Sequence, residues 1–318
     1  MRLLRIFIAA LATAHCAIAF AQTYPSKPVR VVVPYSAGGG ADTVSRILFA
    51  KVAEDLGQAF MIENRGGGGG TIGPAVVAKA SADGYTVLYD ATAHSINPAL
   101  VPNLPYNTRK DFSPVFLAAL VPNLLVVYPP VQVNNVADVI ALAKSGPPLD
   151  WASAGNGSVQ HLALELFRTM TGARLNHVPY KGGGPALNDL VGGHVKFFFS
   201  NASASTSFVK AGQLRAIAHT GRGHLASFPN LPPVSDTVPG FEAYEWNGVF
   251  VPAGTPVEVV ARLNSALNAA LKAPKVAERL ASLSVESRPN SPAEFAAFVA
   301  AETDRWAKVI REANIKLE

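Results

Sequence analysis

The sequence predicts an α/β protein with two domains, in which two parallel-type mixed sheets are flanked by helices and a ligand cleft lies between the domains. Three observations support this: short apolar runs alternate with amphipathic segments, glycine-rich turns join them, and the alternation starts twice. The 318 residues are 49% hydrophobic and 15% charged, which excludes a disordered chain. At about 150 residues per domain, the length also suggests two domains.

Residues 1–21 predict a secretory signal peptide. Two arginines precede a 15-residue apolar run, and Ala-Phe-Ala at 19–21 fits the A-x-A cleavage rule. An uncleaved anchor is the alternative, but the run is shorter than the ~20 residues that a spanning helix needs. Cys16 lies in this segment, and His15 stands before it where lipoprotein processing needs a small residue. We therefore expect cleavage after Ala21 without lipidation, and export.

The first βα module follows directly. We expect strands at 29–33, 59–63 and 86–89, with helices at 42–56 and 72–80. This rhythm is typical of parallel strands with helices on both faces. Residues 101–135 are rich in Pro and Asn, apart from apolar runs near 115–121 and 124–128.

The rhythm restarts at residue 136 and ends in a helical third. The expected helices lie at 136–144, 159–171, 185–191, from 200 to about 211, 256–272, 275–283 and 292–313. The expected strands lie at 150–152, 176–178, 196–199, 214–218 and 248–251. Thr255–Glu258 and Ser291–Glu294 each predict a capping box. Pro-rich stretches at 101–135 and 229–239 suggest two crossings, so we expect domain one at 22–124 plus 248–318 and domain two at 125–247.

The glycine turn at 36–43 is the strongest candidate binding element. It leaves a strand and enters a helix, where unpaired N–H groups and the helix dipole favour an anion. Gly38, Gly39 and Gly40 let the backbone curl around such a ligand, and we place a carboxylate at Gly39. A purely structural turn is the alternative.

A second glycine turn, at 64–73, matches the pattern G-x-G-x-x-G. A run of five glycines with a sixth at Gly73 produces this match easily, and no acidic residue follows at a strand end, so we expect packing and no dinucleotide cofactor. The turns at 91–95, 153–158 and 179–185 also end strands. In parallel sheets such turns lie at the edge where ligands bind. His94 and His161 adjoin the predicted cleft.

Charge and residue types exclude several other functions. Without Arg2 and Arg5, 25 basic and 22 acidic residues remain with no basic run, so nucleic acid is not an expected partner. No cysteine follows the signal segment, no histidine has metal-ligand spacing, and Ser36 is not in a G-x-S-x-G elbow. We expect no metal, no cofactor and no catalysis. A hydrolase-like enzyme is the alternative, and turnover assays with esters and amides would distinguish it from a binding protein.

Eight segments carry a family resemblance. They are 24–28, 33–42, 63–65, 83–86, 96–100, 153–158, 177–183 and 251–256. In these segments, and over essentially all of the mature chain, the sequence resembles the periplasmic substrate-binding proteins of tripartite tricarboxylate transporters, the TctC or Bug family. The resemblance implies a two-domain Venus-flytrap protein of type II topology that captures a small organic carboxylate. It also implies delivery to a membrane permease, and we expect a monomer.

The resemblance also implies the ligand-binding positions. Carried over to this chain, they are Ser36, Ala37, Gly38, Gly39, Gly40, Asp42, Thr43, Thr92, Ala93, His94, Ser95, Ser153, Ala154, Gly155, Asn156, Gly157, Ser158, His161 and Asn201. Ala37, Ala41 and the segment 89–91 depart from the family pattern. A dicarboxylate, an amino acid and an aromatic acid would all fit as ligands. An exported sensor for a membrane signalling partner is the alternative function.

Overall fold

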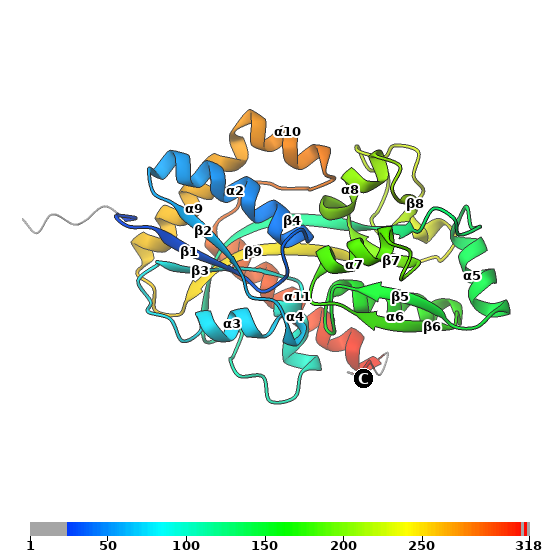
Figure 1. Cartoon of the computed structure of the whole chain (residues 1–318). Coiled ribbons are helices and arrows are strands. Elements are labelled where there is room, and N and C mark those ends of the chain that lie inside the picture. Colours follow the sequence, from blue (N-terminus) through cyan, green and yellow to red (C-terminus); the bar gives the residue numbers. More distant parts are fainter. Residues whose placement is uncertain (1–23, 313–314, 317–318) are drawn as a thin grey trace, which may run out of the picture.

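The computed structural model describes residues 24–312 and 315–316; the predicted signal peptide lies outside them. Figure 1 shows two groups of strands and helices connected by two long strands, β4 (Phe112–Val127) and β9 (Tyr244–Pro252). Among the described residues, no helix has both the length and the apolar composition needed to cross a membrane. The predicted α/β fold with mixed sheets is confirmed.

The first sheet has the strand order β2-β1-β3-β9-β4. Its first three strands are β1 (Val29–Val33), β2 (Phe60–Asn64) and β3 (Thr86–Ala91). β1 pairs in parallel with both β2 and β3, as the rhythm predicts. β9 runs antiparallel to both β3 and β4. β1 therefore lies inside the sheet, while β2 forms its edge.

The second sheet shares β4 with the first. The two apolar runs that the sequence shows near 115–121 and 124–128 form this one strand. Its last residues pair antiparallel with β7 (Phe197–Asn201) and β8 (Arg215–His219). β5 (Leu149–Ser153) then lies between β7 and β6 (Leu175–Pro179), parallel to both. A single long strand thus ties the two sheets together.

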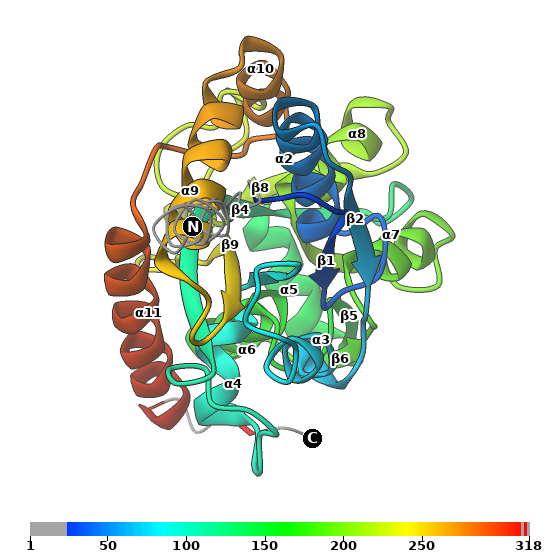
Figure 2. The same cartoon turned by 90° about the vertical axis from the view of Figure 1, so that its left-hand side faces the viewer.

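Helices cover both faces of this sheet system. Those of the first module and the C-terminal third are α2 (Gly40–Leu56), α3 (Ile72–Val77), α4 (Ala93–Leu100), α9 (Val257–Lys272), α10 (Pro274–Ser282) and α11 (Pro292–Glu312). Those of the second module are α5 (Val136–Ser145), α6 (Val159–Thr171), α7 (Gly183–Val191) and α8 (Ala202–Lys210). Short 3₁₀ turns lie at Gly68–Gly70 and Val234–Asp236. Figure 2 shows α2, α9 and α10 on one side of the first sheet and α3, α4 and α11 around the other.

The two predicted capping boxes have different outcomes. At α11, Ser291 and Glu294 form the predicted box, because each backbone N–H donates to the other residue's side chain, at 2.7 and 3.2 Å. At α9 the prediction is wrong. The Thr255 hydroxyl instead donates to the Pro252 carbonyl at 2.7 Å, which closes the turn between β9 and the helix.

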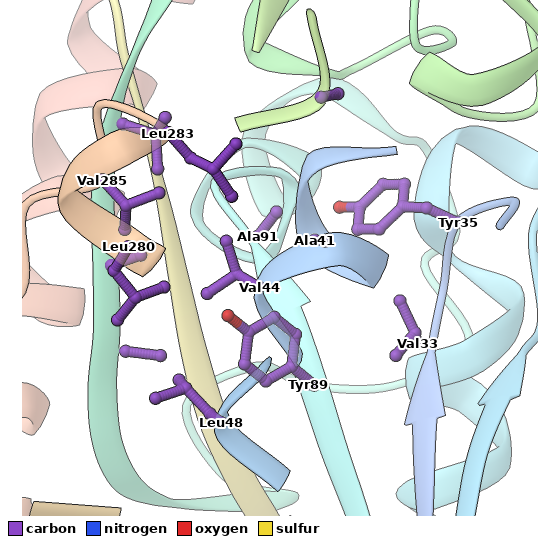
Figure 3. Packing of buried hydrophobic residues seen from close by; sticks show 14 of the residues in the cluster. Val33, Tyr35, Ala41, Val44, Leu48, Tyr89, Ala91, Leu280, Leu283 and Val285 are labelled. Atoms are coloured by element: carbon purple, nitrogen blue, oxygen red, sulfur yellow. The ribbon is translucent and has the colours of Figure 1, made fainter. Parts of the chain in front are cut away.

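The hydrophobic core reaches the carboxyl ends of the central strands. Figure 3 shows Val33, Tyr89 and Ala91 of the first sheet packed beneath α2, with Tyr35 at the end of the cluster. The run Phe197–Phe199 divides between two clusters, as strand alternation predicts. Phe198 packs in the same cluster as α2, while its two neighbours pack with Trp151 on the other face.

The domain boundaries remain a prediction. The expected boundary after residue 124 falls inside β4, where its pairing changes from β9 to β7 and β8. Trp306 and Ile310 of α11 pack in the same core cluster as Trp151 of the second sheet. The C-terminal helix therefore contacts cores on both sides of that boundary. Below, the first lobe means the strands and helices of the first sheet, and the second lobe means β5–β8 with α5–α8.

Candidate functional site

A small cavity lies between the lobes, beside the crossing strand β9 and the end of β7. Its volume is about 30 Å³, which is room for about two water molecules. The residues that line it come from both lobes: Tyr35, Gly39, Gly40, Ala41, Ala91, Thr92, Ala93, Ala154, Ser158, Val159, Gln160, Gly183, Phe198, Ser200, Asn201, Ala204 and Glu245.

Helix N-termini dominate the lining. α2 and α4 of the first lobe begin at Gly40 and Ala93, and both residues line the cavity. From the second lobe, α6 begins at Val159, α7 at Gly183 and α8 directly after Asn201. The first N–H groups of a helix have no partner within the helix, and each N-terminus carries about half a positive charge. The arrangement is therefore suited to an anion.

Glycine is required in the first turn for two different reasons. Gly38 has φ = +79°, a left-handed conformation that other residues rarely adopt. Gly40 has ordinary helical geometry, but a Cβ there would lie 2.4 Å from Cγ of Asn201 in the second lobe. Gly39 is extended, with φ = −78°, and a Cβ there would lie 3.4 Å from the Gly183 nitrogen. Among the three glycines of this turn, Gly40 is thus the one at which an added Cβ would lie closest to the second lobe.

Asp42 holds the first turn in shape. Its carboxylate accepts the Gly38 N–H at 3.0 Å, the Arg46 guanidinium at 2.9 Å and the Asn64 amide at 3.0 Å. Burial raises the pKa of Asp42, but the hydrogen bonds from these three groups outweigh it, so the pKa lies below its usual value. Asp42 does not line the cavity, and its contacts make it a positioning residue.

The rim of the cavity is closed by direct contacts between the lobes. The Ser36 N–H and hydroxyl both donate to the Lys181 carbonyl, at 3.1 and 2.7 Å. The Ser203 hydroxyl donates to the Gly40 carbonyl at 3.4 Å. These bonds join the first glycine turn to the turns before α7 and α8, and so hold the two lobes together beside the cavity.

Two histidines, His161 and His177, contact the loop at 153–158 and hold its conformation. His161 accepts the Gly157 N–H on Nδ1 at 3.3 Å, and its ring stacks on that of His177, with 4.2 Å between centroids. His177 Nε2 lies 2.6 Å from the Ser153 hydroxyl. Burial, the neighbouring His177 and Arg168 lower the pKa of His161 to about 3. His161 is therefore neutral and positions the loop without lining the cavity.

His94 is also removed from the cavity. It is buried against Phe250, with 4.2 Å between ring centroids, and its Nδ1 lies 3.1 Å from an Asp90 carboxylate oxygen. The other Asp90 oxygen accepts the Tyr35 hydroxyl at 3.2 Å and the Ala91 N–H at 2.8 Å. Asp90, one of the departures from the family pattern, thus supports the wall formed by Tyr35 and Ala91.

The structure brings some of the expected site residues together and not others. Those that line the cavity are Gly39, Gly40, Thr92, Ala93, Ala154, Ser158 and Asn201. Those that lie at the rim or in adjoining surface pockets are Ser36, Ala37, Gly38, Thr43, Gly155 and Asn156. Those that support the turns from behind are Asp42, His94, Ser95, Ser153, Gly157 and His161.

Sequence reasoning missed several polar residues of the lining. Tyr35 and Gln160 adjoin predicted turns, so extending those turns by one or two residues would have found them. Ser200 and Glu245 stand on β7 and β9, away from any glycine turn. The signal for Glu245 was that it is the single acidic residue in the mostly apolar segment 243–251. Its carboxylate accepts hydrogen bonds from Gln160 and, at 3.1 Å, from Asn247.

The second glycine turn contacts the other lobe instead of the cavity. Gly69 has φ = +64°, and a Cβ there would lie 2.3 Å from the Asn156 carbonyl oxygen. The Asn97 amide of α4 donates to the Gly69 carbonyl at 3.2 Å. The packing role that the sequence suggests therefore includes contact between the lobes, at an outer groove that Gly155 and Asn156 also line.

Comparison with known proteins places this geometry in a family. Residues 44–315 match the family model described as "Tripartite tricarboxylate transporter family receptor". The periplasmic binding protein BugD is 33% identical, with a TM-score of 0.89 over 93% of this chain and 100% of that chain. Rpa4515 of R. palustris, solved with adipate, is 38% identical, with a TM-score of 0.89 over 92% and 99%. MatC from Rhodopseudomonas palustris, solved with malate, is 34% identical, with a TM-score of 0.86 over 90% and 100%.

The match covers most of the chain and includes the N-termini of α4 and α6, which face the cavity, while α2 begins four residues before the match. The similarity to solved binding proteins extends over both lobes. This chain belongs to the tripartite tricarboxylate transporter receptor (TctC) family of periplasmic solute-binding proteins, which are not enzymes.

Proposed function

We propose that the protein captures a small organic acid, with the acid's carboxylate in the cavity between the lobes. The single observation that carries this proposal is that the N-termini of α2, α4, α6, α7 and α8 all adjoin one cavity. Similarity to Rpa4515 with adipate and MatC with malate supports a carboxylate as the anion. The ligand's carboxylate would accept backbone N–H groups, partly through water.

The affinity expected from this arrangement is moderate. A hydrogen bond to a charged group contributes about 1.5–3 kcal/mol. Three or four such bonds, less the cost of association, are compatible with a micromolar dissociation constant, about −8 kcal/mol. A screen of organic acids by thermal shift on ligand-stripped protein tests this. We expect a rise in melting temperature with at least one carboxylate and none with the matching alcohol or amide.

Capture would proceed by closure of two domains at the predicted boundaries. β4 and β9 cross between the lobes and provide the hinge, and the Ser36–Lys181 contact would form last. Among residues 24–312, no group of three metal-ligating side chains occurs. We therefore expect small-angle scattering to show compaction with the bound acid that EDTA does not reduce. Compaction lost on chelation would contradict this mechanism.

The proposal includes delivery to a membrane permease of the tripartite type, with the protein exported and monomeric. Uptake of the acid by cells should require both this protein and the permease, and size-exclusion chromatography with light scattering should give one chain. Mass spectrometry of exported protein should show a chain that begins at Gln22. A lipid-modified Cys16 would contradict the proposed cleavage after Ala21.

A further inference from the structure

One acidic side chain stands in the wall of the anion cavity. Glu245 lies on β9, is 7% exposed, and lines the cavity together with the helix N-termini. Its carboxylate accepts hydrogen bonds from the amides of Gln160 and Asn247. Both donors are neutral, and in the described part of the chain no ion pair includes Glu245. A buried carboxylate without a cation is costly.

The titratable groups near Glu245 increase that cost. Burial raises the pKa of Glu245, and the Asp90 carboxylate raises it further, although the amides of Gln160, Asn247 and Asn201 oppose the shift. Burial also raises the pKa values of Tyr35 and Tyr89 well above their usual value, so both phenols stay neutral. These groups leave Glu245 without a positive charge to balance it.

The same cavity also presents a donor without a protein partner. The Ser200 hydroxyl is buried, lines the cavity and has no hydrogen-bond partner among the described residues. Together with the helix N-termini it suits a carboxylate. The cavity thus combines a region that favours a negative group with one side chain that favours a positive group.

We propose that Glu245 makes the cavity selective for small amino acids, whose carboxylate takes the helix N-termini and Ser200 and whose ammonium group pairs with Glu245. This inference rests on the proposed function and adds the substrate class. An acid without an ammonium group would bring a second negative charge to Glu245. Binding of such an acid would therefore favour the protonated form of Glu245.

Matched pairs of acids test the proposal, because each pair differs only in the ammonium group. The probes are acetate and glycine, succinate and aspartate, glutarate and glutamate, and adipate and 2-aminoadipate. Calorimetric titrations at pH 7.5 in two buffers of different ionisation enthalpy report both affinity and proton uptake. We expect the preferred amino acid to bind about 10–100-fold more tightly than its partner, the equivalent of one charged hydrogen bond. We also expect proton uptake only with the partner.

Glu245→Gln is the decisive variant, because it keeps the shape and removes the charge. We expect it to weaken binding of the amino acid at least about tenfold and to strengthen binding of the acid without an ammonium group. It should also abolish the proton uptake that accompanies binding of that acid. Glu242→Gln is the control, because Glu242 is a half-buried neighbour that pairs with the exposed Arg222 and does not line the cavity; it should leave the ranking unchanged.

Three outcomes would overturn the inference. In the first, plain acids bind as tightly as amino acids and Glu245→Gln changes nothing. In the second, Glu245→Gln weakens both members of every pair equally, which indicates a structural role only. In the third, no acid of any pair binds to the wild type or the variant; the proposed function itself then fails, and the inference fails with it.

Discussion

The two glycine turns of the first lobe have nearly the same composition and different surroundings. The first, at 38–40, follows β1 and lines the cavity, where a Cβ on Gly40 would meet Asn201. The second, at 66–70, follows β2 and meets the second lobe at the Asn156 carbonyl, in an outer groove. Both turns therefore allow close approach of backbone, but to different parts of the facing lobe.

Position in the sheet explains the difference. β1 lies inside the sheet beside β3, and β3 pairs with the crossing strand β9. β2 is the edge strand, so its turn lies farther from the crossing. In an open α/β sheet the ligand site is built at the carboxyl ends of the inner strands, near a switch in strand order. A glycine run thus indicates that another segment packs closely against the backbone of the turn. The position in the sheet of the preceding strand determines which segment that is.

The largest expected effect is that of Gly40→Ala. Alanine is a better helix former than glycine, and Gly40 has no positive φ, so the free protein should be at least as stable as the wild type. The new methyl group would lie 2.4 Å from Asn201 Cγ and should prevent closure. We expect affinity for the cognate acid to fall at least about 100-fold, roughly 2.7 kcal/mol, measured by calorimetric titration with melting curves.

Gly39→Ala is the matched control in the same turn. Its methyl group would lie 3.4 Å from the Gly183 nitrogen, a contact that a small shift relieves. We expect a loss of affinity well below that of Gly40→Ala. Equal affinity in all three proteins would show that the first turn is only structural.

Gly69→Ala and Gly57→Ala test the second turn. Both positions have φ = +64°, so both alanines should cost about 1–2 kcal/mol of stability. Gly57 has no atom within 4 Å of an added Cβ, whereas Gly69 meets the Asn156 oxygen at 2.3 Å. We expect only Gly69→Ala to weaken ligand binding, by about tenfold, as titration of both variants would show. Undiminished affinity in Gly69→Ala would mean that the outer contact does not take part in closure.

His161 makes the loop at 153–158 sensitive to acid. Its pKa is about 3 in the folded protein, against about 6.5 when unfolded. The unfolded state therefore binds more protons between these values, so this contribution to stability is complete above pH 6.5 and declines as pH falls. Between pH 7 and pH 5.5 we expect a loss of about 1.3 kcal/mol. Denaturant titrations at both values measure it, and His161→Gln should remove most of the difference. An unchanged pH dependence in His161→Gln would contradict a buried neutral ring.

Ser200→Ala should have the smallest effect. The hydroxyl is buried without a protein partner and lines the cavity. Its removal should leave stability unchanged or slightly higher, because no hydrogen bond within the protein is lost. We expect affinity to fall about fivefold, roughly 1 kcal/mol, in the same calorimetric assay. Ser205→Ala, which deletes a buried hydroxyl already bonded to the Asn201 carbonyl, is the control that should lower stability.

Much of the fold follows from local pattern. The strand at Val29–Val33 and the helix at Val159–Thr171 have the predicted bounds, because apolar periodicity and a glycine or serine boundary agree there. α4 was not predicted, since Pro98 stands inside it. The continuity of β4 through Pro122 was also missed. Both depend on long-range packing that a single segment does not encode.

The site was predictable where it is made of backbone. Gly40, Ala93 and Ser158 were found because strand-to-helix turns identify helix N-termini. Glu245 was missed because its place in the cavity wall depends on pairing between β9 and β4, which the sequence does not show. His94 and His161 were predicted to adjoin the cleft, and both stand next to turns that line the cavity. Their side chains, however, contact Asp90 and Gly157 behind these turns instead of lining the cavity.

The central claim is that the converging helix N-termini hold the ligand's carboxylate. A crystal structure of the ligand-stripped protein soaked with, or grown in, the acid selected by thermal shift tests it most directly. We predict carboxylate oxygens, directly or through one water, on the first backbone N–H groups of α2 and at least one of α4, α6 and α8. An acid bound elsewhere, for example in the surface pocket lined by Leu117, Leu120 and Arg288, with the cavity between the lobes unchanged, would contradict the account.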